Sequence, residues 1–310
     1  MPSSNGNLGN FFSHLKGPNF TISVQIDPRS DIDSEAVAGV LSEIYQLGEI
    51  QAVDVNARCS QVAWDSVLTS CAIQNRGFNA IPHVTCRDAS FGGVMNQVLA
   101  AVTHFRLQTV LVIRGDDPRP EFRRCGHGGK GVFQGGTVKL VQALDDLRLG
   151  RHVPDLLIPR VRFAIGVAFD QNAENIKRER RRLAYKRDAR ANFVMSQPVF
   201  NLDQVKLLQA GLKGIWDRPV MVGIWPLQSR EQAVELNANL GGVVIPDSVI
   251  GQMPAVNGGG PEAEEHAKAV GRKLARELLD HIRDNRLFNG AYIISPNRKP
   301  RESLKMLNGV

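Results

Sequence analysis

Short apolar segments alternate with amphipathic segments along nearly the whole chain. The amphipathic stretches, such as 33–48 and 94–106, carry apolar residues three and four positions apart, which is typical of α-helices. Most of the apolar segments lack the alternation of a half-exposed strand, so they are expected to be buried on both faces, as in a parallel sheet. Eight of them predict β-strands: 21–26, 51–56, 80–86, 109–115, 161–168, 193–200, 219–226 and 291–296.

Eight strand-then-helix units in 310 residues predict a single (β/α)8 TIM barrel over residues 20–310. Residues 1–19 are expected to form a flexible N-terminal leader. An extra helix is expected near 245–253, between strands seven and eight, and a last helix within 301–309. The alternative, a doubly wound open sheet, is disfavoured because no GxGxxG motif follows the first strand.

Polar side chains close nearly every predicted strand. In parallel barrels these ends meet at one face, where enzymes of this architecture form their sites. His83 and Gln197 lie within apolar strands, and a buried polar side chain needs a hydrogen-bond partner that a polar ligand can supply. The pattern therefore favours a ligand site over loops that merely begin with polar residues. The side chains are Gln25, Asp27, Asn56, Arg58, His83, Thr85, Arg114, Asp116, Asp170, Gln197, Trp225, Asn297 and Arg298.

The amino-acid composition is that of a globular protein and argues against a membrane protein. Apolar residues make up 43% and charged residues 22%, as in soluble globular proteins, and no apolar run approaches the length of a membrane span. The four cysteines are far apart, with no CxxC pair. This spacing argues against a zinc ribbon or a disulfide scaffold, and it predicts free thiols, no metal site and a cytoplasmic location.

The chain carries a net charge of +7, part of it in the run KRERRR at 177–182. Three interpretations remain open: the solvated face of a helix, attraction of small polyanions such as phosphates or polyglutamates, and nucleic-acid binding. The last is disfavoured because aromatic residues make up only 6% of the chain and none is interleaved with these basic residues.

Five segments resemble the methylenetetrahydrofolate reductase family in order and spacing, from about residue 20 to about residue 308: HVTCRD, VLVIRGDDP, FVMSQPVF, GIWPL and SPNR. VQIDP and GIWPLQSREQAVEL are most similar to the reductase half of bifunctional homocysteine methyltransferase/reductase proteins. The resemblance implies a flavin-bearing (β/α)8 barrel. Such a protein transfers a hydride from NAD(P)H through FAD to 5,10-methylenetetrahydrofolate, giving 5-methyltetrahydrofolate.

The resemblance also implies roles for individual residues. Gln197 and Arg298 would bind the folate, and Arg298 could pair with a carboxylate of its glutamate tail, which could be a polyglutamate. Asp116 would also act in catalysis, by tuning the flavin potential. The residues that would meet the cofactor are His83, Thr85, Arg114, Gly115, Asp116, Phe133, Gln134 and Lys186.

Two departures from the family pattern leave alternatives open. The family carries a glutamate in strand one as general acid for opening the folate ring, but Gln25 stands there; the acid could be Asp27, another residue, or absent. Segment 170–182 lacks the residues that help to hold the flavin dinucleotide. The alternatives are a flavin-free NADH-dependent reductase, and a catalytically silent folate- or flavin-binding partner of a methyltransferase. A homo-oligomer and a reaction running toward methyl-group oxidation are also open.

Overall fold

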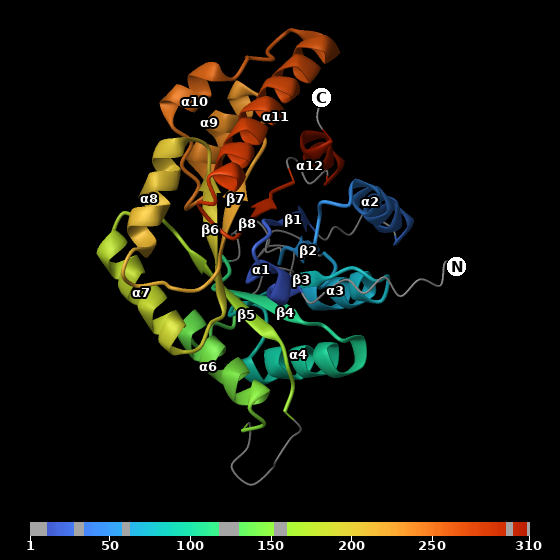
Figure 1. Ribbon diagram of the computed structural model, residues 1–310, viewed down its shortest axis with the longest axis vertical. Coiled ribbons are helices and arrows are strands. Elements are labelled where there is room, and N and C mark those ends of the chain that lie inside the picture. The colour runs from blue at the N-terminus through green and yellow to red at the C-terminus, as the bar shows by residue number, and fades with distance from the viewer. Residues whose placement is uncertain are drawn as a thin grey trace.

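The computed structural model describes residues 11–27, 34–57, 63–117, 130–151, 160–295 and 300–308. Its centre is a closed barrel of eight parallel strands in sequence order, with β8 paired to β1 (Figure 1). The predicted (β/α)8 fold is therefore confirmed. The strands are β1 (Thr21–Ile26), β2 (Ala52–Val55), β3 (Ala80–Thr85), β4 (Thr109–Ile113), β5 (Ala164–Phe169), β6 (Phe193–Val199), β7 (Val220–Ile224) and β8 (Gly290–Ile293).

Helices surround the barrel and follow most strands. In the described part of the chain they are α1 (Phe11–Leu15), α2 (Ser34–Leu47), α3 (Ser66–Gln74), α4 (Phe91–Phe105), α6 (Thr137–Arg148), α7 (Ile176–Asp188), α8 (Leu202–Leu212), α9 (Arg230–Asn239), α10 (Asp247–Gln252), α11 (Gly260–Asp284) and α12 (Pro300–Leu307).

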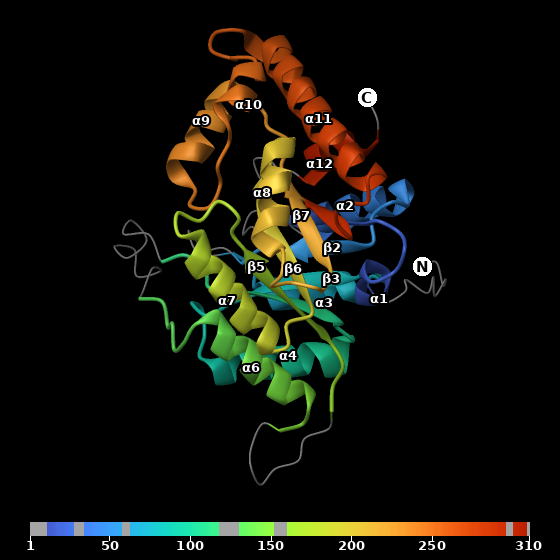
Figure 2. The same ribbon diagram turned by 60° about the vertical axis from the view of Figure 1, so that its left-hand side comes forward.

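The extra helix expected between strands seven and eight is α10. It lies between α9 and the 25-residue α11, and the three helices group at one end of the molecule (Figure 2). Apolar side chains of these helices and of the segments that connect them form a small separate core, which includes Leu227, Ile245, Val249 and Met253. The connection from β7 to β8 is therefore a packed extension of the barrel wall.

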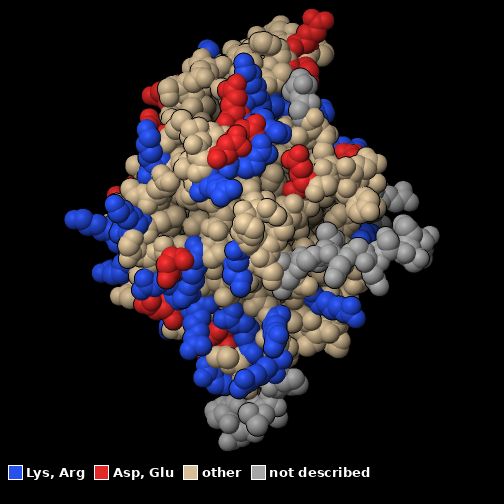
Figure 3. Space-filling model, viewed as in Figure 1, with Lys and Arg blue, Asp and Glu red and all other residues tan. Residues whose placement is uncertain are grey.

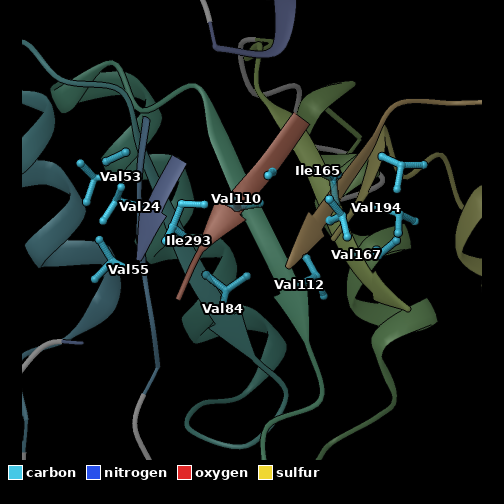
Figure 4. Close-up of a cluster of buried hydrophobic side chains, with 14 of the residues drawn as sticks. Val24, Val53, Val55, Val84, Val110, Val112, Ile165, Val167, Val194 and Ile293 are labelled. Carbon is cyan, nitrogen blue, oxygen red and sulfur yellow. The ribbon is translucent and has the colours of Figure 1, made fainter. Parts of the chain in front are cut away.

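The outward-facing side chains of the strands form the larger of two barrel cores. Val24, Val53, Val110, Ile165 and their neighbours belong to this cluster (Figure 4). These residues are mostly β-branched, which suits both a strand and close packing against helices. Burial on this face and on the inner face explains why most of the strands are continuous apolar runs in the sequence.

The inner core fills the amino-terminal half of the barrel, and α1 closes that end. Phe11 and Leu15 are 1% and 0% exposed and pack with Phe193, whose ring lies edge-on to Phe11 at 5.9 Å. The prediction of a flexible leader over 1–19 is thus corrected for residues 11–15. Phe11 and Leu15 are four residues apart, so one turn of helix places both on the face that plugs the barrel. Residues 1–10 lie outside the described residues.

Candidate active site at the carboxyl end of the barrel

Above the apolar plug, the barrel interior becomes polar on β1, β2 and β3. Gln25 and Asp54 are register partners on adjacent strands, and both are buried. The Oγ of Ser23 donates to Oδ2 of Asp54 at 2.8 Å, and Nε2 of His83 lies 3.6 Å from Oδ1 of Asp54. His83 and Gln25 were predicted site residues, but Asp54 was missed. Its signal was a lone carboxylate inside the apolar strand AVDV.

Gln25 and Asp27 meet at the end of β1, as their spacing of two along a strand implies. The carboxylate oxygen Oδ1 of Asp27 accepts from Nδ2 of Asn56 at 2.9 Å and from Nε2 of Gln25 at 3.4 Å. The Oγ of Ser295 donates to the backbone carbonyl of Gln25. Strand ends β1 and β2 and the residues after β8 are therefore tied together at the mouth of the barrel.

The end of β3 packs tightly against the RGD turn that follows β4. Gly115 has a φ of +78°, and a Cβ there would lie 3.0 Å from Cβ of Arg87 and 3.1 Å from Cβ of Thr85. The Oγ1 of Thr85 donates to Oδ2 of Asp88 at 2.7 Å and accepts from the backbone N–H of Asp88 at 3.2 Å. Glycine thus allows both the backbone conformation of the turn and its close approach to β3.

Arg87 joins these elements, and its role was missed by the sequence analysis although it lies within HVTCRD. Its side chain is only 3% exposed, and Nε and Nη2 donate to the two carboxylate oxygens of Asp88 at 2.6 and 2.8 Å. Nη1 donates to the backbone carbonyl of Asp116 at 3.5 Å, and the carbonyl of Arg87 accepts from the N–H of Val132 at 2.7 Å. One buried arginine therefore connects β3, the RGD turn and the loop before α6.

Arg114, Phe133 and Gln134 come together at the exposed rim beside β4. The guanidinium group of Arg114 stacks over the Phe133 ring at 4.5 Å, and its Nη2 lies 3.3 Å from Oδ1 of Asp117. Gln134 is directed elsewhere, because its Oε1 accepts from the backbone N–H of Phe91 at the start of α4. The carboxylate of Asp116 is exposed and forms no hydrogen bond or ion pair with a residue that the structure describes. The predicted cofactor roles of these residues remain predictions.

Lys186, on α7, is enclosed beside the end of β5, the strand next to β4. It is 7% exposed, its Nζ donates to the carbonyl of Ala168 at 2.7 Å, and it lies 3.6 Å from Oε1 of Glu179. Burial lowers the pKa of Lys186, and the neighbouring Glu179 opposes that shift. Burial also raises the pKa of Asp170 at the end of β5. The carbonyl of Ala168 and the carboxylate of Glu179 therefore stabilise the buried ammonium group.

Gln197 reaches the mouth from an irregular point in β6, where the pairing with β7 shifts between Met195 and Pro198. Gln171 holds its backbone: Oε1 accepts from the N–H of Gln197 at 3.1 Å, and Nε2 donates to its carbonyl at 3.0 Å. The amide of Gln197 lies against Gly242, where an added Cβ would come within 2.9 Å of Nε2. It forms no hydrogen bond to any residue that the structure describes, so its donor and acceptor are free for a ligand.

Arg298, the predicted substrate-binding arginine, lies outside the described residues, as do Arg58 and Asn297. Trp225 at the end of β7 is described, and its buried Nε1 has no hydrogen-bond partner there. Across the described ranges, no group of three or more His, Cys, Asp or Glu side chains is placed to hold a metal ion. Over the same ranges, no helix is long and apolar enough to cross a membrane.

The basic run 177–182 lies on α7, and part of it has a structural use. Nη1 of Arg180 donates to the carbonyls of Ala210 and Gly211 at 2.7 and 2.6 Å, and Nη2 donates to the carbonyl of Lys213 at 2.9 Å. These carbonyls belong to the last turn of α8, which lacks intrahelical donors. Arg178, Arg181 and Arg182 stay exposed, and Lys and Arg side chains gather over α6 and α7 (Figure 3).

Comparisons with known proteins agree with this picture. A family model described as methylenetetrahydrofolate reductase matches residues 15–290. A search of curated proteins found no match. Among solved structures, an uncharacterized protein from Clostridium thermocellum that binds two copies of 5-methyl-5,6,7,8-tetrahydrofolic acid has a TM-score of 0.59 at 12% identity; the alignment covers 95% of this chain and 96% of that one. Oxaloacetate acetylhydrolase in complex with oxalate has a TM-score of 0.50 at 10% identity, covering 92% and 78%. At such identities these likenesses bear on the fold alone.

Proposed function

Because the chain belongs to the methylenetetrahydrofolate reductase family, we propose that it binds a reduced folate at the carboxyl end of the barrel and transfers a hydride between NAD(P)H and the folate one-carbon unit. The substrate pair is 5,10-methylenetetrahydrofolate and 5-methyltetrahydrofolate. The observation that carries the proposal is the extent of the family match, because residues 15–290 include every described polar side chain from β1 to β7 at the mouth.

The mouth offers groups suited to a pterin ring, which presents hydrogen-bond donors and acceptors side by side. The carboxamide of Gln197 has an NH2 group that can donate and a carbonyl oxygen that can accept. Neither group forms a hydrogen bond with a residue that the structure describes. A bound ligand would exclude water from this amide, and an amide without a hydrogen bond would then be destabilising. A ligand that forms hydrogen bonds with the amide avoids this free-energy penalty. The methyltetrahydrofolate bound by the Clostridium thermocellum protein is a ligand of the same class, and it motivates the choice of folate here.

The proposal includes FAD as cofactor, with a rearranged site. The turn of Arg114, Gly115 and Asp116 leaves an exposed carboxylate and a guanidinium group at the rim, which fit the polar edge of a flavin ring. The diphosphate half fits less well, because the buried ammonium group of Lys186 is committed to Ala168 and Glu179. FAD would supply a hydride relay at this face.

The enclosure of Lys186 favours a second candidate function. In a flavin-free reductase the hydride passes directly from NADH to the folate, and no cation is needed for a flavin diphosphate. A visible spectrum of the purified protein separates the two candidates. Flavin bands released by acid denaturation support the FAD enzyme, whereas a colourless protein that reduces folate supports direct transfer.

The finer resemblance, to the reductase half of bifunctional methyltransferase/reductase proteins, makes a methyltransferase a candidate partner. The proposal also includes a cytoplasmic location, and a homo-oligomer remains compatible with it.

The test of the function is NAD(P)H oxidation that depends on added 5,10-methylenetetrahydrofolate, with 5-methyltetrahydrofolate as product. Each nicotinamide cofactor is assayed separately, and oxidation of 5-methyltetrahydrofolate with NAD(P)⁺ is assayed in the reverse direction. A protein that binds 5-methyltetrahydrofolate but turns over in neither direction contradicts the reductase and favours a silent folate-binding partner.

A further inference from the structure

Asp54 is a buried carboxylate with one possible cationic partner among the described residues of the barrel interior. It is 0% exposed, Ser23 satisfies Oδ2, and Oδ1 has no hydrogen bond. Among the described residues, the only basic side chain near Asp54 is His83, which is 6% exposed; its Nε2 lies 3.6 Å from Oδ1 of Asp54 and also has no hydrogen bond. An isolated buried charge is costly, so a carboxylate here is stabilised if the facing imidazole carries a proton.

The other titratable groups that the structure describes around the pair have interactions of their own or lie at the mouth. Tyr292 faces the same interior from β8, but its hydroxyl donates to the carbonyl of Ser196 at 2.5 Å, and burial, with the charge of Asp54, raises its pKa. Asp27 stands above, at the mouth, where its Oδ1 accepts from two amide groups. Asp170 lies at the end of β5, beside Lys186. The remaining neighbours on β1 and β4, Gln25 and Leu111, are uncharged.

The register places Asp54 beside the position where an acid is missing. Gln25 on β1 and Asp54 on β2 are paired residues whose side chains point to the same face of the sheet. An amide at Gln25 cannot deliver a proton, whereas the neighbouring strand carries a carboxylate at the same level. A carboxylate is thus present at the same level of the barrel as Gln25, but on β2 instead of β1.

His83 has the geometry to connect that carboxylate with the mouth. Its Nε2 is enclosed and faces Asp54, while Nδ1 is not fully enclosed and has no partner among the described residues. The Oγ of Ser66 donates to the backbone carbonyl of His83 at 2.7 Å, which fixes the strand at this point. One ring nitrogen therefore faces the buried charge, and the other remains open to a ligand.

We propose that the Asp54–His83 pair supplies the proton for folate ring opening, with His83 as the donor and Asp54 as the residue that positions and charges it. The inference rests on the proposed function. The Nδ1–H bond of His83 breaks as an N–H bond forms at N10 of 5,10-methylenetetrahydrofolate. The bond from N10 to the methylene carbon breaks with its electron pair on N10, leaving an iminium cation at N5. A hydride from NAD(P)H then reduces that carbon to the methyl group, and solvent returns a proton to His83.

The test compares Asp54→Asn, which keeps the shape and removes the charge, with Thr109→Val as control. Thr109 is a buried residue of β4 whose hydroxyl has no described partner, so its isosteric replacement perturbs the interior without touching the pair. Asp54→Asn should lower kcat for folate reduction by about 10²-fold, within the range for a general acid, and leave folate affinity unchanged. Adding Gln25→Glu to Asp54→Asn should recover at least about tenfold of that loss by restoring a carboxylate next to the ring.

A measurement without substrate tests the pair directly. Nitrogen-15 NMR of the histidine side chains, with His83 assigned by its absence in His83→Gln, should give ring signals for His83 that change between the wild type and Asp54→Asn, because the carboxylate lies 3.6 Å from Nε2. Identical His83 signals in the two proteins overturn the inference. So does wild-type folate reduction that survives Asp54→Asn. If the wild type lacks turnover altogether, the proposed function fails, and the NMR result still decides whether Asp54 acts on the His83 ring.

Discussion

At the scale of single residues, Gly115 sets the conformation of the turn after β4 and the distance of that turn from β3. It combines a left-handed backbone conformation with contact to the end of β3. Gly214 offers a matched comparison, because its φ is +77° but nothing lies within 4 Å of an added Cβ. Alanine at Gly214 would lower stability through backbone strain alone, whereas alanine at Gly115 would also contact the end of β3. Comparing the two variants therefore separates the two contributions to the free energy of unfolding.

Gly115→Ala should therefore destabilise the fold by about 2–4 kcal/mol, since strain and overpacking add, whereas Gly214→Ala should cost about 1 kcal/mol. Urea unfolding of both variants measures the difference. Equal losses would show that the turn is free to move away from Arg87 and Thr85.

Gln197 carries the expected contact with the folate. Removing its amide in Gln197→Ala should weaken binding of 5-methyltetrahydrofolate by about 1–3 kcal/mol, because pterin groups that were paired are left unsatisfied. Calorimetric titration measures the affinity, and an unchanged thermal midpoint confirms that β6 is intact. Wild-type affinity in this variant would place the pterin elsewhere.

At the scale of elements, α7 and α8 are joined by an arginine from the basic run 177–182, for which a solvated helix face was one of three open interpretations. Arg180 satisfies three carbonyls at the end of α8, whereas the adjacent Arg181 is exposed. Arg180 thus caps the end of α8, while the neighbouring Arg181 extends into solvent.

Arg180→Ala should lower the free energy of unfolding by about 1–3 kcal/mol, because three carbonyls at the end of α8 lose a charged donor. Arg181→Ala should change it by no more than about 0.5 kcal/mol. Both variants lose one positive charge, so denaturant unfolding separates capping from net charge. Equal effects in the two variants would contradict the capping role.

The elements that could be predicted were those with strong local patterns. The first strand was placed at its observed bounds because apolar residues alternate along it, at Ile22, Val24 and Ile26, and a polar turn follows. The five-residue α1 was missed because so short a helix is stable only through packing against the barrel. Asp54, Arg87 and the enclosure of Lys186 were missed for a related reason. Their partners come from other strands and loops, and their burial follows from barrel closure rather than from neighbouring residues.

At the scale of the whole molecule, one end of the barrel is closed by apolar side chains and the other carries the polar site. The plug depends on Phe11 and Leu15, which precede the first strand. The structure therefore predicts that a segment outside the eight strand–helix units contributes to global stability.

Phe11→Ala should cost about 3–5 kcal/mol, as for other buried phenylalanines, whereas Ser13→Ala, at an exposed position of the same helix, should be nearly neutral. Thermal or urea unfolding provides the measurement. A neutral Phe11→Ala would mean that α1 is dispensable and that the leader extends to the first strand.

The central claim, hydride transfer to a folate at the mouth of this barrel, is tested most directly by product analysis under single-turnover conditions. Purified protein in excess is mixed with 5,10-methylenetetrahydrofolate and NADH or NADPH, and the folates are separated by chromatography and weighed by mass spectrometry. We expect one 5-methyltetrahydrofolate for each nicotinamide cofactor oxidised. Recovery of unchanged methylenetetrahydrofolate with either cofactor, from folded protein that binds the folate, would contradict it.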